Sequence, residues 1–327
     1  MRGNSGYEER SSAPAIALAL VLVLVGLLGI GAYFVVGPGA GGTSSQDELE
    51  QQEQAQVLEA KSFTDYTWSE LSQIAQMISA ADSDEAGRQI AQQYNLVTSA
   101  GTLTTEEHDV VTSDNVLAKA RLVGIRADEK FDGSGKAGLT LMVTTVTRRV
   151  MNQTDTCDGG WAASDMRTWF ASDGMSLLPS DLVSVIVPVS KLSNNVGLTA
   201  DSSSVNATSD SLWLFSASEV CGSLDWFNQE YAESYDLNAD FYDELLSSEG
   251  EQYEGFSQAG ITCAREAYDY LTLTYGGASG GWWLRTAYPF DYLGNDHGCF
   301  YQVMKNGLVS TVGQASTSQG VVIGLCL

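Results

Sequence analysis

The stretch from residue 13 to residue 36 carries no charged side chain, and it constrains the fold more than any other feature of the sequence. It reads APAIALALVLVLVGLLGIGAYFVV. As a helix it would be about 36 Å long, which is enough to cross the hydrocarbon core of a bilayer. We therefore predict a transmembrane helix at residues 13–36. A cleaved signal peptide is the alternative, but its apolar stretch is usually about 7–15 residues long, and VVGPGAGG is a poor cleavage site.

The basic residues near this stretch predict its orientation. Arg2 and Arg10 precede it, and the next basic residue is Lys61. Because basic residues stay on the cytoplasmic side, residues 1–12 should form a cytoplasmic tail, and everything after the span should lie outside. The sequence thus predicts a single-pass protein of the cell membrane with an extracytoplasmic C-terminal part. All five cysteines fall in that part, where disulfides are permitted, but the sequence does not disclose their pairing.

The charge of the chain restricts its partners. The 327 residues carry a formal net charge of −25, from 41 acidic and 16 basic side chains. A surface of this kind repels nucleic acid, so we expect no nucleic-acid partner. The expected partners are the membrane, through residues 13–36, and an unknown surface glycan or protein. Hydrophobic residues make up 44% of the chain, which is enough to build a folded core.

One acidic segment is a candidate calcium site, and we predict no other cofactor. Its oxygen-bearing side chains alternate like those at the start of an EF-hand loop: Asp236, Asn238, Asp240 and Asp243. The sixth position is Phe241 where the motif needs glycine, and the twelfth is Ser247 where it needs glutamate. A solvated acidic loop without a metal is the alternative interpretation.

Residues 37–60 are rich in Gly, Ser, Gln and Glu and are typical of a linker. Residues 61–101 predict a helical hairpin. Thr67 and Glu70 form a capping box at the start of the first helix, and Ser83 or Asp84 caps a second helix that should end near Asn95.

Residues 102–327 predict a mixed α+β domain. We expect strands at 116–128, 137–151, 211–220, 282–290 and 320–327, helices at 163–172 and within 177–188, and a hairpin at 299–312. Ser164 should cap the first of these helices, and Pro188 should end the second. Asn306 and Gly307 predict a type I′ turn in the hairpin.

The strand at 282–290 holds the best ligand-binding candidates. Side chains alternate along a strand, so Trp282 and Trp283 should face opposite sides, with Arg285 on the side of Trp283. One tryptophan could stack on a ligand while Arg285 holds a carboxylate. Alternatively, the strand belongs to the core and the arginine is paired internally. Trp161 and Arg167 are candidates of the same kind. No residue is assigned a catalytic role.

Six ordered blocks carry a family resemblance: GGWAASDMRTWF, LLPSDLVSVIVPVSK, SDSLWLFSASEV, EGEQYEGF, GGWWLRTAYPF and GVVIGLCL. Together they resemble a bacterial family of extracytoplasmic domains of unknown function, number 6273, which has a WWLRS strand and a terminal strand similar to GVRPAF. The resemblance covers about residues 102–327. Thr286 stands where the family tends to have Ser, and GVVIG stands where it often has Arg and Pro, so a ligand contact made by that arginine would be absent here.

The block layout of this family is distantly similar to the C-type-lectin-like fold, which includes the formylglycine-generating enzyme. The resemblance therefore implies an α+β domain of short antiparallel strands with two or three helices. It implies a binding module for a glycan, peptide or protein, for which we expect an exposed aromatic cluster in a groove. The alternatives are a cysteine-dependent oxidase, with Cys299 and Cys326 brought together, and a purely structural envelope ectodomain with wholly buried tryptophans.

Overall fold

The computed structural model describes residues 58–222, 244–262, 266–275, 278–290, 298–309 and 311–327. Residues 58–327 form one compact unit. The transmembrane helix expected at residues 13–36 and the cytoplasmic tail before it lie outside the described residues, as does most of the linker. None of the helices described is both long and apolar enough to cross a membrane.

The unit begins with a helical hairpin, α3 (Trp68–Ser79) and α4 (Asp84–Gln93). The predicted capping box of Thr67 and Glu70 is confirmed, and Ser83 caps α4. The apolar face of α3 is wholly buried, because its helical spacing points Leu71, Ile74 and other apolar residues at the rest of the unit.

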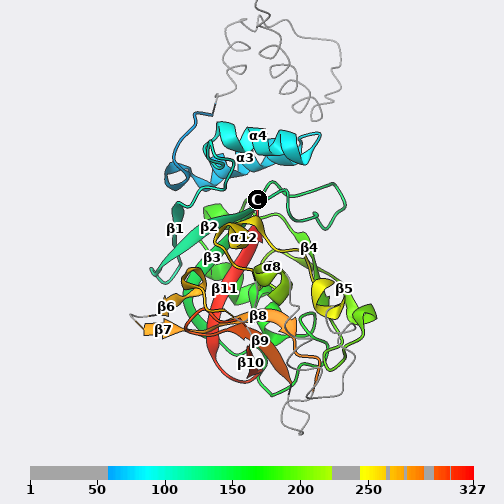
Figure 1. The fold of residues 1–327 in the computed structure, drawn as a ribbon. Coiled ribbons are helices and arrows are strands. Elements are labelled where there is room, and N and C mark those ends of the chain that lie inside the picture. Colours follow the sequence, from blue (N-terminus) through cyan, green and yellow to red (C-terminus); the bar gives the residue numbers. More distant parts are fainter. Residues whose placement is uncertain (1–57, 223–243, 263–265, 276–277, 291–297, 310) are drawn as a thin grey trace, which may run out of the picture. The chain divides into compact units, whose positions relative to one another are not determined.

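A seven-stranded sheet forms the centre of the unit, in the order β1-β2-β3-β11-β8-β9-β10. The strands are β1 (Glu107–Val111), β2 (Leu117–Ile125), β3 (Leu139–Arg149), β8 (Trp282–Ala287), β9 (Cys299–Val303), β10 (Thr311–Gln314) and β11 (Gln319–Cys326). All neighbours pair antiparallel except β11 and β8, which are parallel. The C-terminal strand β11 therefore lies inside the sheet, with β1 and β10 at its edges (Figure 1).

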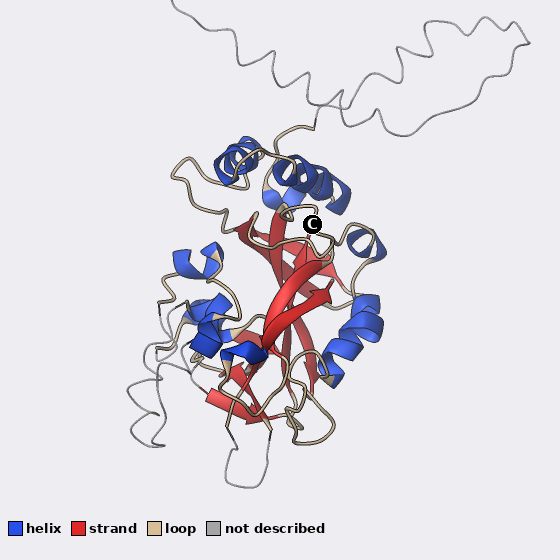
Figure 2. Ribbon diagram, turned by 90° about the vertical axis from the view of Figure 1, so that its right-hand side faces the viewer, coloured by secondary structure: helices blue, strands red, loops and turns tan. Residues whose placement is uncertain are grey.

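Both faces of the sheet are covered, with helices on either side (Figure 2). Along β11, Val321, Ile323 and Leu325 belong to the apolar cluster that includes the helical hairpin, whereas Val322 belongs to a second cluster on the other face. This alternation explains why the strand is apolar at nearly every position. The C-terminus lies beside the hairpin in both views (Figures 1 and 2).

Short elements complete the unit. They are η1 (Phe63–Asp65), α5 (Asp165–Trp169), η2 (Phe170–Gly174), α6 (Met175–Leu177), α7 (Ser180–Val183), β4 (Val189–Asn194), η3 (Ser202–Ser204), β5 (Val205–Asp210), α8 (Ala217–Cys221), α12 (Glu254–Gln258), η4 (Asp269–Leu271), β6 (Leu273–Tyr275) and β7 (Ala278–Gly280). The result is the mixed α+β architecture expected from the sequence, with one large sheet and few helices.

Three local predictions were wrong. Residues 211–220 form no strand: Trp213 makes one isolated bridge to Gly324, and a second capping box, formed by Ser216 and Glu219, starts helix α8. Helix α7 ends at Val183, before the β-branched residues that precede Pro188. Gly307 has a positive φ of 82° but Asn306 does not, so the tight turn beside β9 is not type I′.

Candidate functional site

The two adjacent tryptophans of β8 are core residues. Trp282 and Trp283 are fully buried and belong to the two different apolar clusters, as strand alternation predicts. The Nε1 group of Trp282 donates to the carbonyl of Leu271 at 3.0 Å, and that of Trp283 donates to the carbonyl of Arg149 at 2.9 Å. Neither ring is exposed to a ligand, so the core-strand interpretation of this stretch holds.

Arg285 is also fully buried, and all the N–H groups of its guanidinium donate to partners inside the protein. Its guanidinium pairs with both carboxylate oxygens of Glu219. The remaining N–H groups reach Ser193 Oγ and three backbone carbonyls, those of Leu192, Leu214 and Glu249. A guanidinium has five N–H groups, and here every nitrogen is saturated. Arg285 therefore holds the protein together and has no donor left for a ligand.

A buried ion network surrounds this arginine. We use that name for Asp128, Lys191, Glu219, Glu249, Tyr253 and Arg285. The ammonium of Lys191 donates to Asp128 at 2.8 Å, to the Tyr253 hydroxyl at 2.7 Å and to Glu219. An ammonium has three donors, so Lys191 is saturated as well. The network joins β4, α8, β8, the segment before α12 and the loop after β2.

Opposite charges decide the ionisation of most of this network. Burial alone would raise the pKa of Asp128, but Lys191 outweighs it and holds that pKa below its ordinary value. Burial would likewise raise the pKa of Glu219, but Arg285 and Lys191 lower it. Burial would lower the pKa of Lys191, yet the two carboxylates hold it above its ordinary value. These groups stay charged and paired, as buried charges must.

Glu249 is the exception, because its burial outweighs the charge of Arg285 and raises the pKa of its carboxyl. Its two oxygens accept from the Asn194 backbone at 2.8 Å and from the Thr286 hydroxyl. Both partners are neutral. The folded protein therefore favours the protonated form of Glu249 more than the unfolded chain does.

Replacing Glu249 with glutamine should stabilise the protein at pH 8 and leave its stability unchanged at pH 4. While the carboxyl is protonated in both the folded and the unfolded protein, it does not lower folding stability. Because its pKa is raised in the folded protein, the loss of folding stability grows as the pH rises from the unfolded towards the folded pKa. Glutamine can accept from the Asn194 backbone through its amide oxygen and donate through its amide nitrogen to the Thr286 hydroxyl, without that cost. We expect a gain on the order of 2–4 °C in Tm at pH 8, measured by thermal unfolding. An equal gain at both pH values would contradict this explanation.

A pocket of about 520 Å³ lies over the network. The buried polar groups of the network that line it are already paired with one another. Its lining includes Asp128, Lys191, Glu219 and Tyr253, whose mutual hydrogen bonds are described above. At its rim, Arg126 and Lys136 both pair with Asp84.

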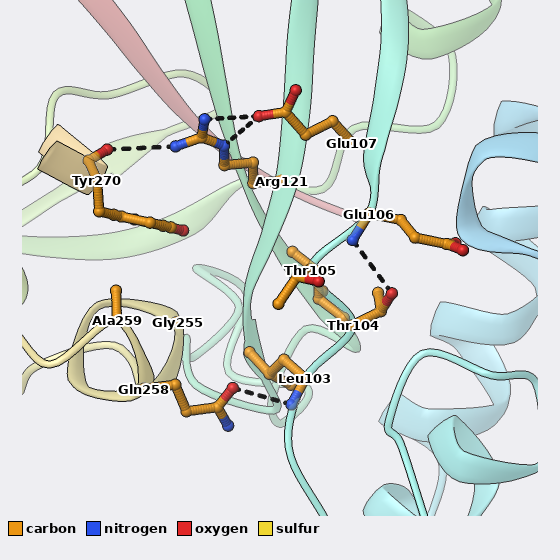
Figure 3. Close-up of a pocket in the computed structure, with 11 residues that line it drawn as sticks. Leu103, Thr104, Thr105, Glu106, Glu107, Arg121, Gly255, Gln258, Ala259 and Tyr270 are labelled. Atoms are coloured by element: carbon orange, nitrogen blue, oxygen red, sulfur yellow. Dashed lines mark hydrogen bonds and ion pairs between the residues drawn. The ribbon is translucent and has the colours of Figure 1, made fainter. Parts of the chain in front are cut away.

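A second pocket, of about 300 Å³, is lined in part by polar groups that lack a partner among the described residues. We call it the Tyr270 groove. It lies between the start of β1, the strand β2, the helix α12 and η4 (Figure 3). Its lining residues are Leu103, Thr104, Thr105, Glu106, Glu107, Arg121, Leu122, Gly255, Gln258, Ala259 and Tyr270. The accessible surface of this pocket is mostly apolar, although several of these residues have polar side chains, Arg121 among them.

Arg121 lies over the ring of Tyr270, with the guanidinium carbon 4.8 Å from the ring centroid. Its Nε and Nη2 both contact Glu107 Oε1 at 2.6 Å, and its Nη1 donates to the Tyr270 carbonyl at 3.3 Å. In Figure 3 the ring extends from η4 between this guanidinium and the wall formed by Gly255 and Ala259. Burial raises the pKa of the Tyr270 hydroxyl, and the charge of Arg121 opposes that rise.

Arg121 differs from Arg285 in what its donors do. Its five N–H groups have three contacts with the described part of the chain, and the Tyr270 hydroxyl also interacts with the guanidinium, so no more than two N–H groups are left without a partner. Its side chain is 27% exposed, whereas that of Arg285 is fully buried. Glu107 Oε2 also lacks a partner among the described residues. Arg121 therefore keeps hydrogen-bonding capacity that Arg285 lacks.

The other candidate residues lie elsewhere. Trp161 is fully buried, and its Nε1 donates to Asp210 at 3.2 Å. Arg167 binds the same carboxylate through Nε at 2.6 Å. The structure thus brings Trp161 and Arg167 together through Asp210, in a structural contact. The calcium candidates Asp236, Asn238, Asp240 and Asp243 lie outside the described residues.

The described cysteines include two buried thiols with raised pKa values. Burial raises the pKa of Cys157 to about 11, and it raises that of Cys326 well above its ordinary value. A nucleophilic or metal-binding cysteine needs the opposite shift. Within the described ranges, no three His, Cys, Asp or Glu residues are grouped so that they could hold a metal ion.

Sequence reasoning missed Arg121, Glu107 and Tyr270. The strand expected at 116–128 contained Arg121, but its contact with Tyr270 joins residues 149 positions apart. No sequence motif predicts a contact between two residues so far apart in the chain. The alternation along β2, which turns Arg121 away from the buried Leu122, was the only available signal.

The described residues define a mixed α+β domain with a small cleft, the Tyr270 groove. The chain belongs to the family described as "Domain of unknown function (DUF6273)", whose model matches residues 107–327. No curated protein and no solved structure matches the chain.

Five of the six blocks that carry the family resemblance contribute to or touch the buried ion network. In block order these residues are Lys191, Glu219, Glu249 with Tyr253, Arg285 and Cys326. None of the blocks contains Arg121, Glu107 or Tyr270. The ion network therefore draws on residues of these blocks, whereas the groove combines Arg121, Glu107 and Tyr270, which lie outside the blocks, with Gly255 of the block EGEQYEGF.

Proposed function

We propose that residues 58–327 are a non-enzymatic binding module whose ligand occupies the Tyr270 groove. The observation that carries this proposal is the unspent hydrogen-bonding capacity of Arg121 beside an aromatic ring in a cleft. Pockets that bind small ligands combine apolar walls with a few polar groups that fix orientation. The raised thiol pKa values of Cys157 and Cys326 favour binding over cysteine-dependent oxidation.

Residues 13–36 would anchor this module in the cell membrane, with the module on the extracytoplasmic side. Support comes from the charge-free apolar stretch and from the basic residues that precede it. The net charge of −25 suits such an exposed, soluble module.

Replacing Tyr270 with alanine should weaken ligand binding about tenfold or more, because an aromatic contact and one wall of the groove are lost. Arg121→Met should do the same. The measurement is a screen of glycans, peptidoglycan fragments and peptides on an array, with and without calcium, followed by titration of each ligand found.

Two matched variants control for this screen. Phe131→Ala removes an exposed aromatic ring outside the groove, and Lys119→Met removes a second β2 cation that pairs with Asp109 on β1. Both should bind like the unmodified protein. Ligands that bind all four variants equally would place recognition outside the groove.

A purely structural ectodomain is the second candidate. The complete burial of Trp161, Trp282 and Trp283 favours it, because these residues serve the core alone. This candidate predicts that no array component binds in a Tyr270-dependent manner.

A further inference from the structure

We infer that Lys191 and Asp128 of the buried ion network form an intramolecular amide bond after the chain folds, with the loss of one water molecule. The bond cross-links β4 to the loop that follows β2. It is independent of the Tyr270 groove and of any ligand bound there. It follows from the contacts of the two side chains, from the partners of each carboxylate oxygen, and from the burial of the pair.

The fold holds the two reacting groups in contact. Lys191 Nζ lies 2.8 Å from Asp128 Oδ1, so the carboxyl carbon of Asp128 is only one bond further away. The two residues are 63 positions apart in the chain, and each side chain is only 4% exposed. An amine held beside an acyl carbon in this way reacts within one molecule, which makes amide formation far faster than an encounter in solution.

The two carboxylate oxygens of Asp128 have different partners, and this difference assigns a role to each. Oδ2 accepts from the Thr140 hydroxyl at 2.6 Å and from the Cys326 thiol at 3.4 Å. These donors stabilise the negative charge that develops on Oδ2 when the amine attacks the carbon. Oδ1 accepts from Lys191 at 2.8 Å and from the Tyr253 hydroxyl at 2.7 Å, so it is the oxygen that takes up protons and leaves.

The protons of the ammonium group account for the whole reaction. The first passes from Lys191 Nζ to Asp128 Oδ1, which leaves a neutral amine beside a neutral carboxyl. The amine attacks the carboxyl carbon, and its second proton passes to Glu219, which contacts Nζ, and from there to the leaving hydroxyl. The bond between the carbon and Oδ1 breaks, one water is released, and the third hydrogen stays on the amide nitrogen. The reaction needs no oxidant, reductant or further reactant.

Burial favours the amide over the ion pair. Desolvation opposes the charges of Lys191 and Asp128, and neighbouring opposite charges keep both groups ionised. The amide removes both charges from the interior, while Glu219 keeps its pair with Arg285. The pocket of about 520 Å³ is lined by both reacting residues, so the released water can leave through it. The neutral amine is rare while the ion pair persists, so the reaction is slow, but each chain needs it only once.

The test is the intact mass of the purified full-length protein in denaturant, followed by tandem mass spectrometry of its proteolytic peptides. We expect a mass about 18 Da below that of the sequence, because one water is lost when the amine acylates, and a branched peptide that joins Lys191 to Asp128. Lys191→Arg keeps the positive charge but replaces the amine by a guanidinium that stays protonated, and Asp128→Ala removes the acyl carbon. Both variants should therefore have the full mass of their sequences.

The chain contains a matched control in Lys119 and Asp109, an exposed ion pair whose peptides should be found unlinked. Thr140→Val leaves both reacting groups in place but removes a donor to Oδ2, so it should slow the mass loss in newly synthesised protein about tenfold or more. The full mass in the unmodified protein, with separate peptides for Lys191 and Asp128, would overturn the inference even if no variant folds. Loss of water that persists in Lys191→Arg would overturn it as well.

Discussion

A chain that begins at residue 107, where the family match starts, should fail to fold cooperatively, whereas one that begins at residue 58 should fold. The segment removed buries large apolar side chains against the sheet: Phe63, Tyr66, Trp68, Leu71, Ile74, Ile78, Leu96, Val97 and Leu103. Each contributes about 1.5–3 kcal/mol when buried. Their sum exceeds the net stability of about 5–15 kcal/mol that a folded domain has, even if the hairpin keeps part of that burial to itself.

Near-UV circular dichroism and urea unfolding of the two chains would measure this effect. Gly138→Ala in the longer chain is a milder version of the same test. A Cβ at this position would lie 2.0 Å from the carbonyl oxygen of Ala75 on α3, so the hairpin would be pushed away from β3. We expect this variant to lose about 1–3 kcal/mol. A cooperative transition in the chain that begins at residue 107 would show instead that the hairpin is an independent addition.

Local sequence signals predicted the elements that depend on local physics. The Thr67–Glu70 capping box and the Ser164 cap act within a few residues, and the structure contains both of them. The β-rich runs at 116–128 and 137–151 likewise contain the strands β2 and β3. The error at residues 211–220 came from the apolar run LWLF, which suits a buried strand. The capping box of Ser216 and Glu219 was visible in the sequence and would have predicted helix α8.

The site was harder to predict, because its contacts are distant in the sequence. Arg285 bonds to residues 36 to 93 positions away, and Arg121 bonds to one 149 positions away. An isolated arginine on a strand gives no sign of whether its partners will saturate it. Sequence analysis therefore selected Arg285, whose contacts are structural, and missed Arg121, whose guanidinium is not saturated by the described residues.

This difference suggests how the domain is organised. The blocks that define the resemblance converge on a saturated ion network, which fixes β4, α8 and β8 relative to each other. The groove draws on β1, β2, α12 and η4, of which only α12 overlaps one of those blocks, where Gly255 lines the groove. A buried network whose members are all hydrogen-bonded can hold such a groove rigid, and rigid walls reduce the entropy lost when a ligand binds.

Arg285→Met should destabilise the protein by about 3–5 kcal/mol, the usual cost of removing one partner from a buried ion pair. Glu219 would keep Lys191 but lose both of its contacts with the guanidinium. The carbonyls of Leu214 and Glu249 would lose a donor in a region that water does not reach. Arg285→Lys should recover only part of this loss, because an ammonium has three donors and no planar fork.

Arg121→Met provides the matched control, since it removes the same group from another strand of the same sheet. Its ion pair with Glu107 is partly exposed, so its loss should cost no more than about 1 kcal/mol. Urea unfolding of the two variants, beside ligand titration, should therefore give opposite patterns: Arg285→Met lowers stability, and Arg121→Met lowers affinity. Equal stability losses would mean that the burial and the hydrogen-bond saturation of Arg285 do not distinguish it from Arg121. The division between scaffold and groove would then be wrong.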